Sequence, residues 1–132
     1  MVINEVSSFE EVKNKTIRHR VKRASTGRSL EYVANLDGYE VGLLSLEPGR
    51  RPSDQGFIYE VYVLPEFRSK GVGEKLMIHA ESQARKLGCK SVRLEARAFD
   101  HTIETQWLIS WYRKQGFEMT AGSTEYMEKS LA

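Results

Sequence analysis

The sequence lacks any long hydrophobic run, and it is poor in cysteine. Its longest unbroken apolar stretch, residues 61–64, falls far short of the roughly 20 residues that cross a bilayer. Residues 1–20 carry charges throughout and contain no apolar segment of the kind found in a signal peptide. The one cysteine, Cys89, is too few for an intrachain disulfide. We therefore expect a cytoplasmic protein without membrane contact.

Candidate metal ligands are also scarce. The three histidines, at positions 19, 79 and 101, form none of the common zinc spacings with Cys89, so we expect no metal site. Hydrophobic residues make up 40% of the 132 residues and charged residues 29%, which is close to the globular average. This length and composition predict a single domain over residues 1–132.

Basic charge is concentrated at the start of the chain. Residues 1–28 hold seven Lys or Arg and three Glu, whereas the remaining residues hold thirteen basic and fifteen acidic side chains. Such a segment can attract an anionic partner, although a solvated helix face has the same composition. No aromatic residue interleaves the basic run of residues 18–23, so the pattern disfavours a nucleic-acid partner while leaving one open.

Local patterns predict an α/β domain built around one central mixed sheet. Ser8 precedes two glutamates and is typical of a helix N-cap, and Asp37-Gly38 between two apolar runs is typical of a β-hairpin. The predicted helices are residues 8–23, 71–87 and 102–115, and the predicted strands are residues 30–36, 39–46, 57–64, 91–96, 117–121 and 125–131, with a short strand over residues 2–5 left open.

The strongest chemical motif is residues 68–73 (RSKGVG), which follow a predicted strand and open an amphipathic helix. Free N–H groups and the helix dipole make such a helix start a seat for an anion, and glycines let phosphates approach the backbone. The motif matches neither the P-loop nor the dinucleotide-binding fingerprint. A turn whose glycines serve geometry alone is the alternative interpretation.

Two blocks together resemble the GNAT superfamily of N-acetyltransferases. Residues 63–76 (VLPEFRSKGVGEKL) are similar to its acyl-CoA-binding signature, Arg/Gln-x-x-Gly-x-Gly/Ala after a strand ending Val-x-Pro. Residues 111–117 (WYRKQGF) resemble the family's Tyr-x-x-x-Gly-Phe. A helix, a strand and a loop separate the blocks, as in the family, and the resemblance covers about residues 30–131.

The resemblance implies a GNAT-like fold with a splayed strand pair, flanking helices and a shortened N-terminal part. The splayed strands would be residues 57–64, which carry a bulge in the family, and residues 91–96. Acetyl-CoA would place its pantetheine arm between them and its pyrophosphate on the glycine motif, with CoA as the product. The implied cofactor-binding residues are Val61, Tyr62, Val63, Arg68, Ser69, Lys70, Gly71, Val72 and Gly73.

The resemblance also implies catalytic roles for two side chains. Tyr112 occupies the place of a tyrosine that many members hold near the thioester sulfur, where a phenol can give a proton to a departing thiolate; a packed aromatic is the alternative. Glu60 is the candidate general base, or else a carboxylate paired with a basic neighbour. Many members carry Asn seven residues before the tyrosine and Ala four before it, where this chain has Thr105 and Leu108. We expect Thr105 to keep a hydrogen bond to the cofactor.

The function expected from this resemblance is acetyl transfer to a primary amine, by direct attack on acetyl-CoA in a ternary complex. A non-catalytic acyl-CoA-binding or sensing module is the alternative, which would keep residues 68–73 without needing Glu60 or Tyr112. The acceptor is left open between a small-molecule amine and an amine of a protein or peptide. An exposed closing hairpin also permits a homodimer.

Overall fold

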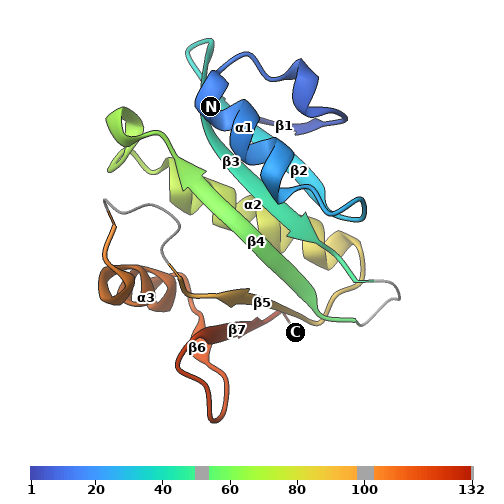
Figure 1. Cartoon of the computed structure of the whole chain (residues 1–132). Coiled ribbons are helices and arrows are strands. Elements are labelled where there is room, and N and C mark those ends of the chain that lie inside the picture. The colour runs from blue at the N-terminus through green and yellow to red at the C-terminus, as the bar shows by residue number, and fades with distance from the viewer. Residues whose placement is uncertain (50–53, 98–102, 132) are drawn as a thin grey trace.

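The computed structural model describes residues 1–49, 54–97 and 103–131. Seven strands form one sheet in the order β1-β2-β3-β4-β5-β7-β6 (Figure 1). The β4–β5 pair is parallel and the other neighbouring pairs are antiparallel, so the predicted α/β class with a mixed sheet is confirmed. The strands are β1 (Val2–Val6), β2 (Leu30–Leu36), β3 (Tyr39–Glu47), β4 (Gly56–Val63), β5 (Ser91–Glu95), β6 (Glu118–Met119) and β7 (Tyr126–Ser130).

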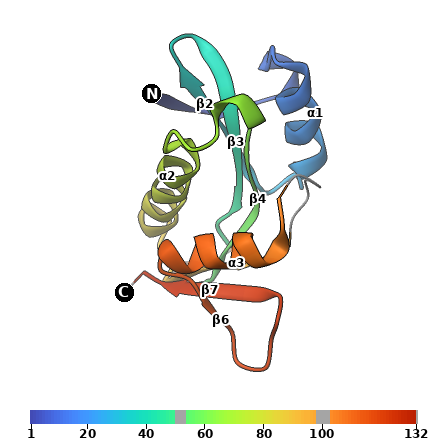
Figure 2. The ribbon, with the colours of Figure 1, turned by 90° about the vertical axis from the view of Figure 1, so that its left-hand side faces the viewer.

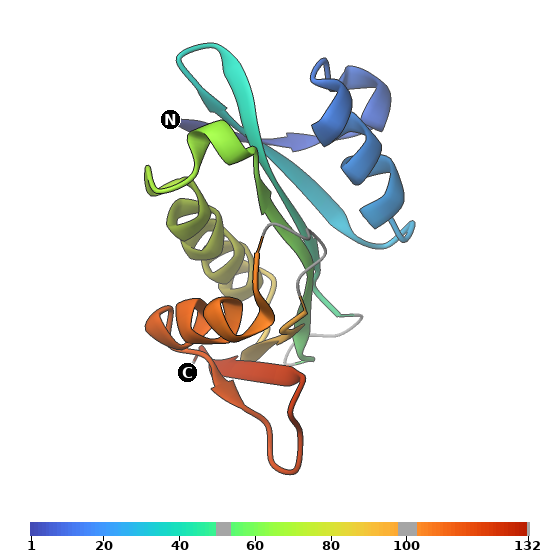
Figure 3. The same ribbon diagram turned by 60° about the vertical axis from the view of Figure 1, so that its left-hand side comes forward.

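Helices cover both faces of this sheet. The helix α1 (Lys15–Ala24) and the helix α2 (Val72–Lys86) lie on opposite sides of β3 and β4 (Figure 2). The helix α3 (Thr105–Lys114) lies on the same side as α2 (Figure 3). None of the helices that the structure describes has the length and apolar character needed to cross a membrane.

The core is divided by the sheet into two clusters. On the α1 side it consists of Val12, Ile17, Val21, Val33, Leu43, Tyr62 and Leu64. The larger cluster lies under α2 and α3 and includes Leu44, Leu46, Ile58, Leu76, Met77, Leu94, Ile109, Tyr112, Phe117 and Met127. The two sides of β4 therefore face different environments, and the functional site uses both.

The parallel strands β4 and β5 pair only at one end. Gly56, Phe57 and Ile58 face residues 92–94, after which the two strands diverge (Figure 1). The strand β4 nevertheless continues to Val63. Among the residues that the structure describes, its backbone groups beyond Ile58 that point toward β5 consequently have no strand partner, as expected for a splayed strand pair.

A bulge in β4 lies next to the point of divergence. Leu46 of β3 faces Ile58 and Ser45 faces Glu60, so Tyr59 is an extra residue in the ladder. An extra residue bends a strand and reverses the face on which later side chains lie. Accordingly, Ile58 packs in the α2-side cluster, while Tyr62, four positions later, packs on the α1 side.

The predicted first helix, residues 8–23, was wrong at its start. Ser8 caps a short 3-10 turn (Phe9–Glu11), and α1 begins only at Lys15, where the Asn14 side chain accepts a hydrogen bond from the N–H of Ile17 at 3.0 Å. The reason is a tertiary contact, since the Glu40 carboxylate accepts hydrogen bonds from the N–H groups of Lys13 and Asn14.

Two later elements are shorter than predicted. The helix α3 begins at Thr105, and residues 98–102 lie outside the described residues. The predicted strand over residues 117–121 is reduced to Glu118–Met119. Phe117 cannot join it, because its N–H donates to the Tyr112 carbonyl at 3.1 Å and so closes the end of α3.

Candidate active site

The glycine motif forms the connection between β4 and α2, as the sequence predicted. The chain leaves β4 through a 3-10 turn (Pro65–Phe67), and Arg68 donates from its Nε to the Val63 carbonyl at 2.9 Å. Gly71 is the N-cap of α2, with a φ of 82° and no side-chain hydrogen bond to the helix start. The first N–H groups of α2 therefore have no capping side chain and are available to an anion.

The two glycines of the motif serve different purposes. A Cβ on Gly71 would meet no atom within 4 Å, so its positive φ, which L-residues adopt at a penalty, explains the glycine. A Cβ on Gly73 would lie 3.2 Å from Cζ2 of Trp111. Gly73 thus permits α3 to pack closely over the start of α2, and its role is at least partly structural.

A cleft of about 760 Å³ lies between β4, the start of α2 and α3. Apolar side chains of β4 and α3 form most of its wall, and the uncapped start of α2 forms one end. Its principal lining residues are Val61, Val63, Phe67, Arg68, Ser69, Gly71, Val72, Gly73, Trp107, Leu108, Trp111 and Tyr112.

A smaller cavity of about 60 Å³ lies in the gap between β4 and β5 and reaches the α1 side. Apolar side chains such as Ile58 and Leu94 line it together with charged and polar ones, namely Arg20, Tyr59, Glu60, Glu95, Arg97 and Tyr112. The cleft and the cavity share a wall made of Val61, Val63, Arg68, Ile103, Leu108 and Tyr112. The two cavities therefore adjoin, and we call their combined lining the path. It runs from the anion seat of α2, along the free edge of β4, toward the α1 face of the sheet.

Tyr112 lies where the two cavities meet. Its side chain is 6% exposed and contacts the rings of Trp111 and Phe117, at centroid distances of 5.3 and 6.1 Å. Burial, followed by the negative charge of Glu60, raises the pKa of Tyr112 above its ordinary value of 10. The phenol is therefore protonated at neutral pH and can offer its O–H as a hydrogen-bond donor.

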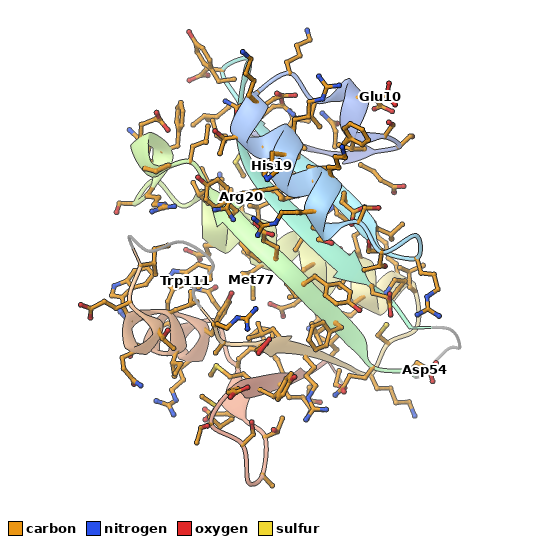
Figure 4. The ribbon with its side chains drawn as sticks, viewed as in Figure 1. Glu10, His19, Arg20, Asp54, Met77 and Trp111 are labelled. Carbon is orange, nitrogen blue, oxygen red and sulfur yellow. The ribbon has the colours of Figure 1, made fainter. Side chains whose placement is uncertain are left out.

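Glu60 points to the α1 side of β4 and is ion-paired. Its Oε2 accepts a hydrogen bond from Nη1 of Arg20 at 2.7 Å, and the two side chains are 7% and 15% exposed. Arg20 reaches from α1 over β4 (Figure 4) and covers the Tyr62 ring at 3.8 Å from its centroid. The basic partner considered in the sequence is thus present, and Glu60 also lies close enough to Tyr112 for its charge to affect that phenol.

Other predicted residues fall into two groups. Ser69 and Val72 line the cleft beside the glycines, and the buried Tyr62 contributes its backbone to β4 while its ring faces α1. Lys70 and Thr105 are exposed and are absent from the lining of either cavity within the described part of the chain. Three further residues of the site were not predicted from the sequence, namely Trp107, Trp111 and Arg20. The helical spacing of the two tryptophans could have indicated a shared face, whereas nothing local marks Arg20.

Comparisons with known proteins agree with this geometry. The model of the acetyltransferase (GNAT) family matches residues 3–117. The chain belongs to this family. The GNAT resemblance of the sequence is thereby confirmed. Within residues 1–49, 54–97 and 103–131, no group of three or more His, Cys, Asp or Glu side chains could hold a metal ion.

Relatives support the same assignment at different levels. The chain is 34% identical over 88 residues to an uncharacterized N-acetyltransferase, YjgM, of Escherichia coli, a match that covers 66% of this chain and 50% of that protein. The chain thus spans about half the length of this curated GNAT relative.

Solved structures match over nearly the whole chain. Ard1 from Thermoplasma volcanium aligns with a TM-score of 0.69 at 24% identity, covering 99% of this chain and 97% of that one. A GNAT family acetyltransferase from Elizabethkingia anophelis with acetyl-CoA bound aligns with a TM-score of 0.74 at 13% identity, covering 98% and 97%. These likenesses show that the two proteins share the fold of this GNAT chain.

Proposed function

We propose that this chain is an acetyl-CoA-dependent N-acetyltransferase that acetylates a primary amine. The observation that carries the proposal is the path from the uncapped start of α2, along the free edge of β4, to the buried Tyr112. The same path then opens to the α1 side of the sheet, where a second substrate can enter. One route thus serves two substrates that approach from opposite faces.

The described residues fit the pyrophosphate and the pantetheine arm of acetyl-CoA. The amides of Val72 and Gly73 begin α2 without a capping side chain and offer hydrogen bonds to the pyrophosphate, with Arg68 adding positive charge. The backbone of residues 61–63 has no β5 partner, although the Val63 carbonyl accepts a hydrogen bond from Arg68. The amide groups of pantetheine can supply the remaining partners that a strand would otherwise provide. When bound, acetyl-CoA supplies an activated thioester.

Tyr112 and Glu60 then divide the proton transfers. The amine nitrogen forms a bond to the acetyl carbon, and the bond from that carbon to sulfur breaks. Tyr112, which is protonated at neutral pH, donates its proton to the departing thiolate, and the second proton that the nitrogen carries after its attack passes through water to the resulting phenolate. The ammonium of the acceptor must lose a proton before it attacks, and Oε1 of Glu60 accepts it directly or through water, since Oε2 is engaged by Arg20. A backbone N–H on the free edge of β4 stabilises the negative charge on the acetyl oxygen.

One observation favours the alternative of a non-catalytic acyl-CoA-binding module. The Arg20–Glu60 ion pair holds the candidate base in a structural interaction, and a module that only binds acyl-CoA would need no base. Such a module would bind acetyl-CoA and release no thiol with any amine.

The deciding experiment combines binding with turnover. Acetyl-CoA and CoA are titrated into the protein by calorimetry, and free thiol release is then followed with a panel of small amines, amino acids and peptide N-termini. We expect saturable binding of both nucleotides and thiol release with one class of amine. Binding without acceptor-dependent release would favour the non-catalytic module, and absence of binding would refute both functions.

A further inference from the structure

An exposed tryptophan stands at the mouth of the cleft. Trp107 on the first turn of α3 is 56% exposed and lines the cleft together with Gly71 and Gly73. A large aromatic side chain normally buries most of its surface. This ring instead offers a flat apolar surface to solvent beside an anion seat, which is the arrangement expected of a surface that a ligand covers.

The second tryptophan of the chain fixes the position of the first. Trp111 follows Trp107 by four residues and therefore lies on the same side of α3. Its ring lies against Gly73, since a Cβ on Gly73 would be 3.2 Å from Cζ2 of Trp111. The centroids of the Trp111 and Tyr112 rings are 5.3 Å apart. The helix that carries Trp107 is thereby held against the start of α2, so the exposed ring is presented from a rigid support.

We propose that Trp107 stacks on the adenine ring of bound CoA or acetyl-CoA. The inference rests on the proposed function. With the thioester beside Tyr112 and the pyrophosphate on the Gly71–Gly73 amides, the adenosine must leave the cleft at its mouth. The α3 wall of the cleft carries Trp107 there, and an indole ring is a favourable stacking surface for any nucleobase.

This contact also fits a departure seen in the sequence. Thr105, which the sequence resemblance proposed as a polar contact to the cofactor, is exposed and does not line the cleft that the structure describes. Stacking on Trp107, two residues further along α3, replaces a polar contact by an apolar one on the same helix. The nucleotide end of the cofactor is then held mainly by a ring surface and by backbone amides.

The test compares ligands that differ in the adenine. The affinities of CoA, of dephospho-CoA, which lacks only the 3′-phosphate, and of 4′-phosphopantetheine, which lacks the adenosine and one phosphate of the pyrophosphate, are measured by calorimetry. We expect Trp107→Ala to weaken CoA and dephospho-CoA alike by roughly 10- to 100-fold and to leave 4′-phosphopantetheine within about 2-fold. Trp107→Tyr, which retains an aromatic face, should restore most of the loss. Ile78→Ala on α2 is the matched control, because Ile78 is 57% exposed and lies outside the lining of the cleft.

Fluorescence gives an independent readout, since the chain contains only two tryptophans. The Trp107 contribution is the difference between the wild-type protein and Trp107→Phe, and it should be quenched by CoA and not by 4′-phosphopantetheine.

Equal weakening of all three ligands, or no effect of Trp107→Ala on any of them, would overturn the stacking while leaving the proposed function intact. Wild-type protein that binds none of the three would refute both. If Trp107→Ala lowered the rate of thiol release without changing CoA affinity, Trp107 would instead contact the acceptor. If the wild-type protein dimerised with rising concentration and Trp107→Ala abolished this while CoA affinity stayed unchanged, Trp107 would contact a second copy of the chain.

Discussion

Arg20 and Glu60 are separated by 40 positions along the chain, yet their side chains meet at 2.7 Å on the α1 face of β4. The contact attaches a short N-terminal helix to the strand β4, whose residues line both the cleft and the smaller cavity. It also places a cation next to the candidate base.

Removing Arg20 alone should destabilise the fold. Arg20→Met leaves the Glu60 carboxylate buried at 7% exposure without its partner, and an uncompensated buried charge lowers the free energy of unfolding by about 3 kcal/mol. The double variant Arg20→Met with Glu60→Gln should recover much of this loss. Urea unfolding of the wild type, of Arg20→Met, of Glu60→Gln and of the double variant measures the coupling energy between the two side chains. A single variant as stable as the wild type would mean that water already solvates the pair. Thiol release by the stable double variant then reports whether Glu60 is needed for turnover.

The two glycines of the motif should respond differently to alanine. Gly71→Ala has room for its Cβ and should lower the free energy of unfolding by about 1–2 kcal/mol through its left-handed φ alone. Gly73→Ala brings its Cβ to 3.2 Å from the Trp111 ring and should shift the tryptophan emission of the unliganded protein. Emission spectra and urea unfolding distinguish the two effects, with each variant serving as the control for the other. Identical emission from both variants would show that the Trp111 contact is not maintained in solution.

Tyr112→Phe should slow turnover while preserving acetyl-CoA affinity. The hydroxyl matters when charge develops on the sulfur, and loss of one positioned donor to a developing anion lowers the rate roughly 10- to 1,000-fold. The ring contacts with Trp111 and Phe117 remain, so the free energy of unfolding should change by at most about 1 kcal/mol. Stopped-flow thiol release and calorimetry provide the two readouts. A wild-type rate in the Phe variant would leave Tyr112 as a packing residue.

Protonation of His79 should destabilise the protein in mild acid. Burial, followed by the positive charge of Lys86, lowers the pKa of His79 below its ordinary value of 6.5. Its Nε2 is buried without a hydrogen-bond partner in the described residues, and its ring packs on Tyr32 at 4.6 Å. Below pH 6.5 the unfolded chain therefore binds a proton that the folded chain resists, and the free energy of unfolding falls as the pH decreases.

The measurement for His79 is a comparison of urea midpoints at pH 7.5 and pH 5.5. The decrease on acidification should be smaller in His79→Phe than in the wild-type protein, because the carboxylates titrate in both proteins and only the wild type has the imidazole. Equal decreases would show that His79 becomes protonated in the folded state as readily as in the unfolded chain.

The sequence predicted those parts of the fold that local chemistry determines. Asp37 and Gly38 both have positive φ values, 50° and 85°, as a hairpin turn of this composition requires. Gly88, predicted to end the second helix, has a φ of 85°, and the N–H of the following Cys89 donates to the Ala84 carbonyl at 2.9 Å. In each case the residues that decide the conformation lie within a few positions of one another.

Contacts between distant segments were not predictable in the same way. Glu40 determines where α1 begins, although it lies 26 residues from Asn14. The motif left open whether Gly73 serves phosphate approach or local geometry, and only the docking of α3 shows that Trp111 occupies the space beside it. The sequence proposed Glu60 as a base and left a basic partner open, yet it could not name Arg20 on a helix that reaches β4 from the other end of the domain.

Removal of the bulge at Tyr59 should leave the chain folded but unable to bind the proposed ligand. Deleting Tyr59 would restore regular pairing between β3 and β4 and keep Glu60 and Tyr62 facing α1, because the extra residue is the one removed. The strand would also lose the bend beside the point where it leaves β5, and hydrogen bonding between β4 and β5 would extend beyond Ile58. The result would be a more regular sheet with a closed gap. On the proposed function, this irregularity of one residue keeps open the gap that acetyl-CoA would enter.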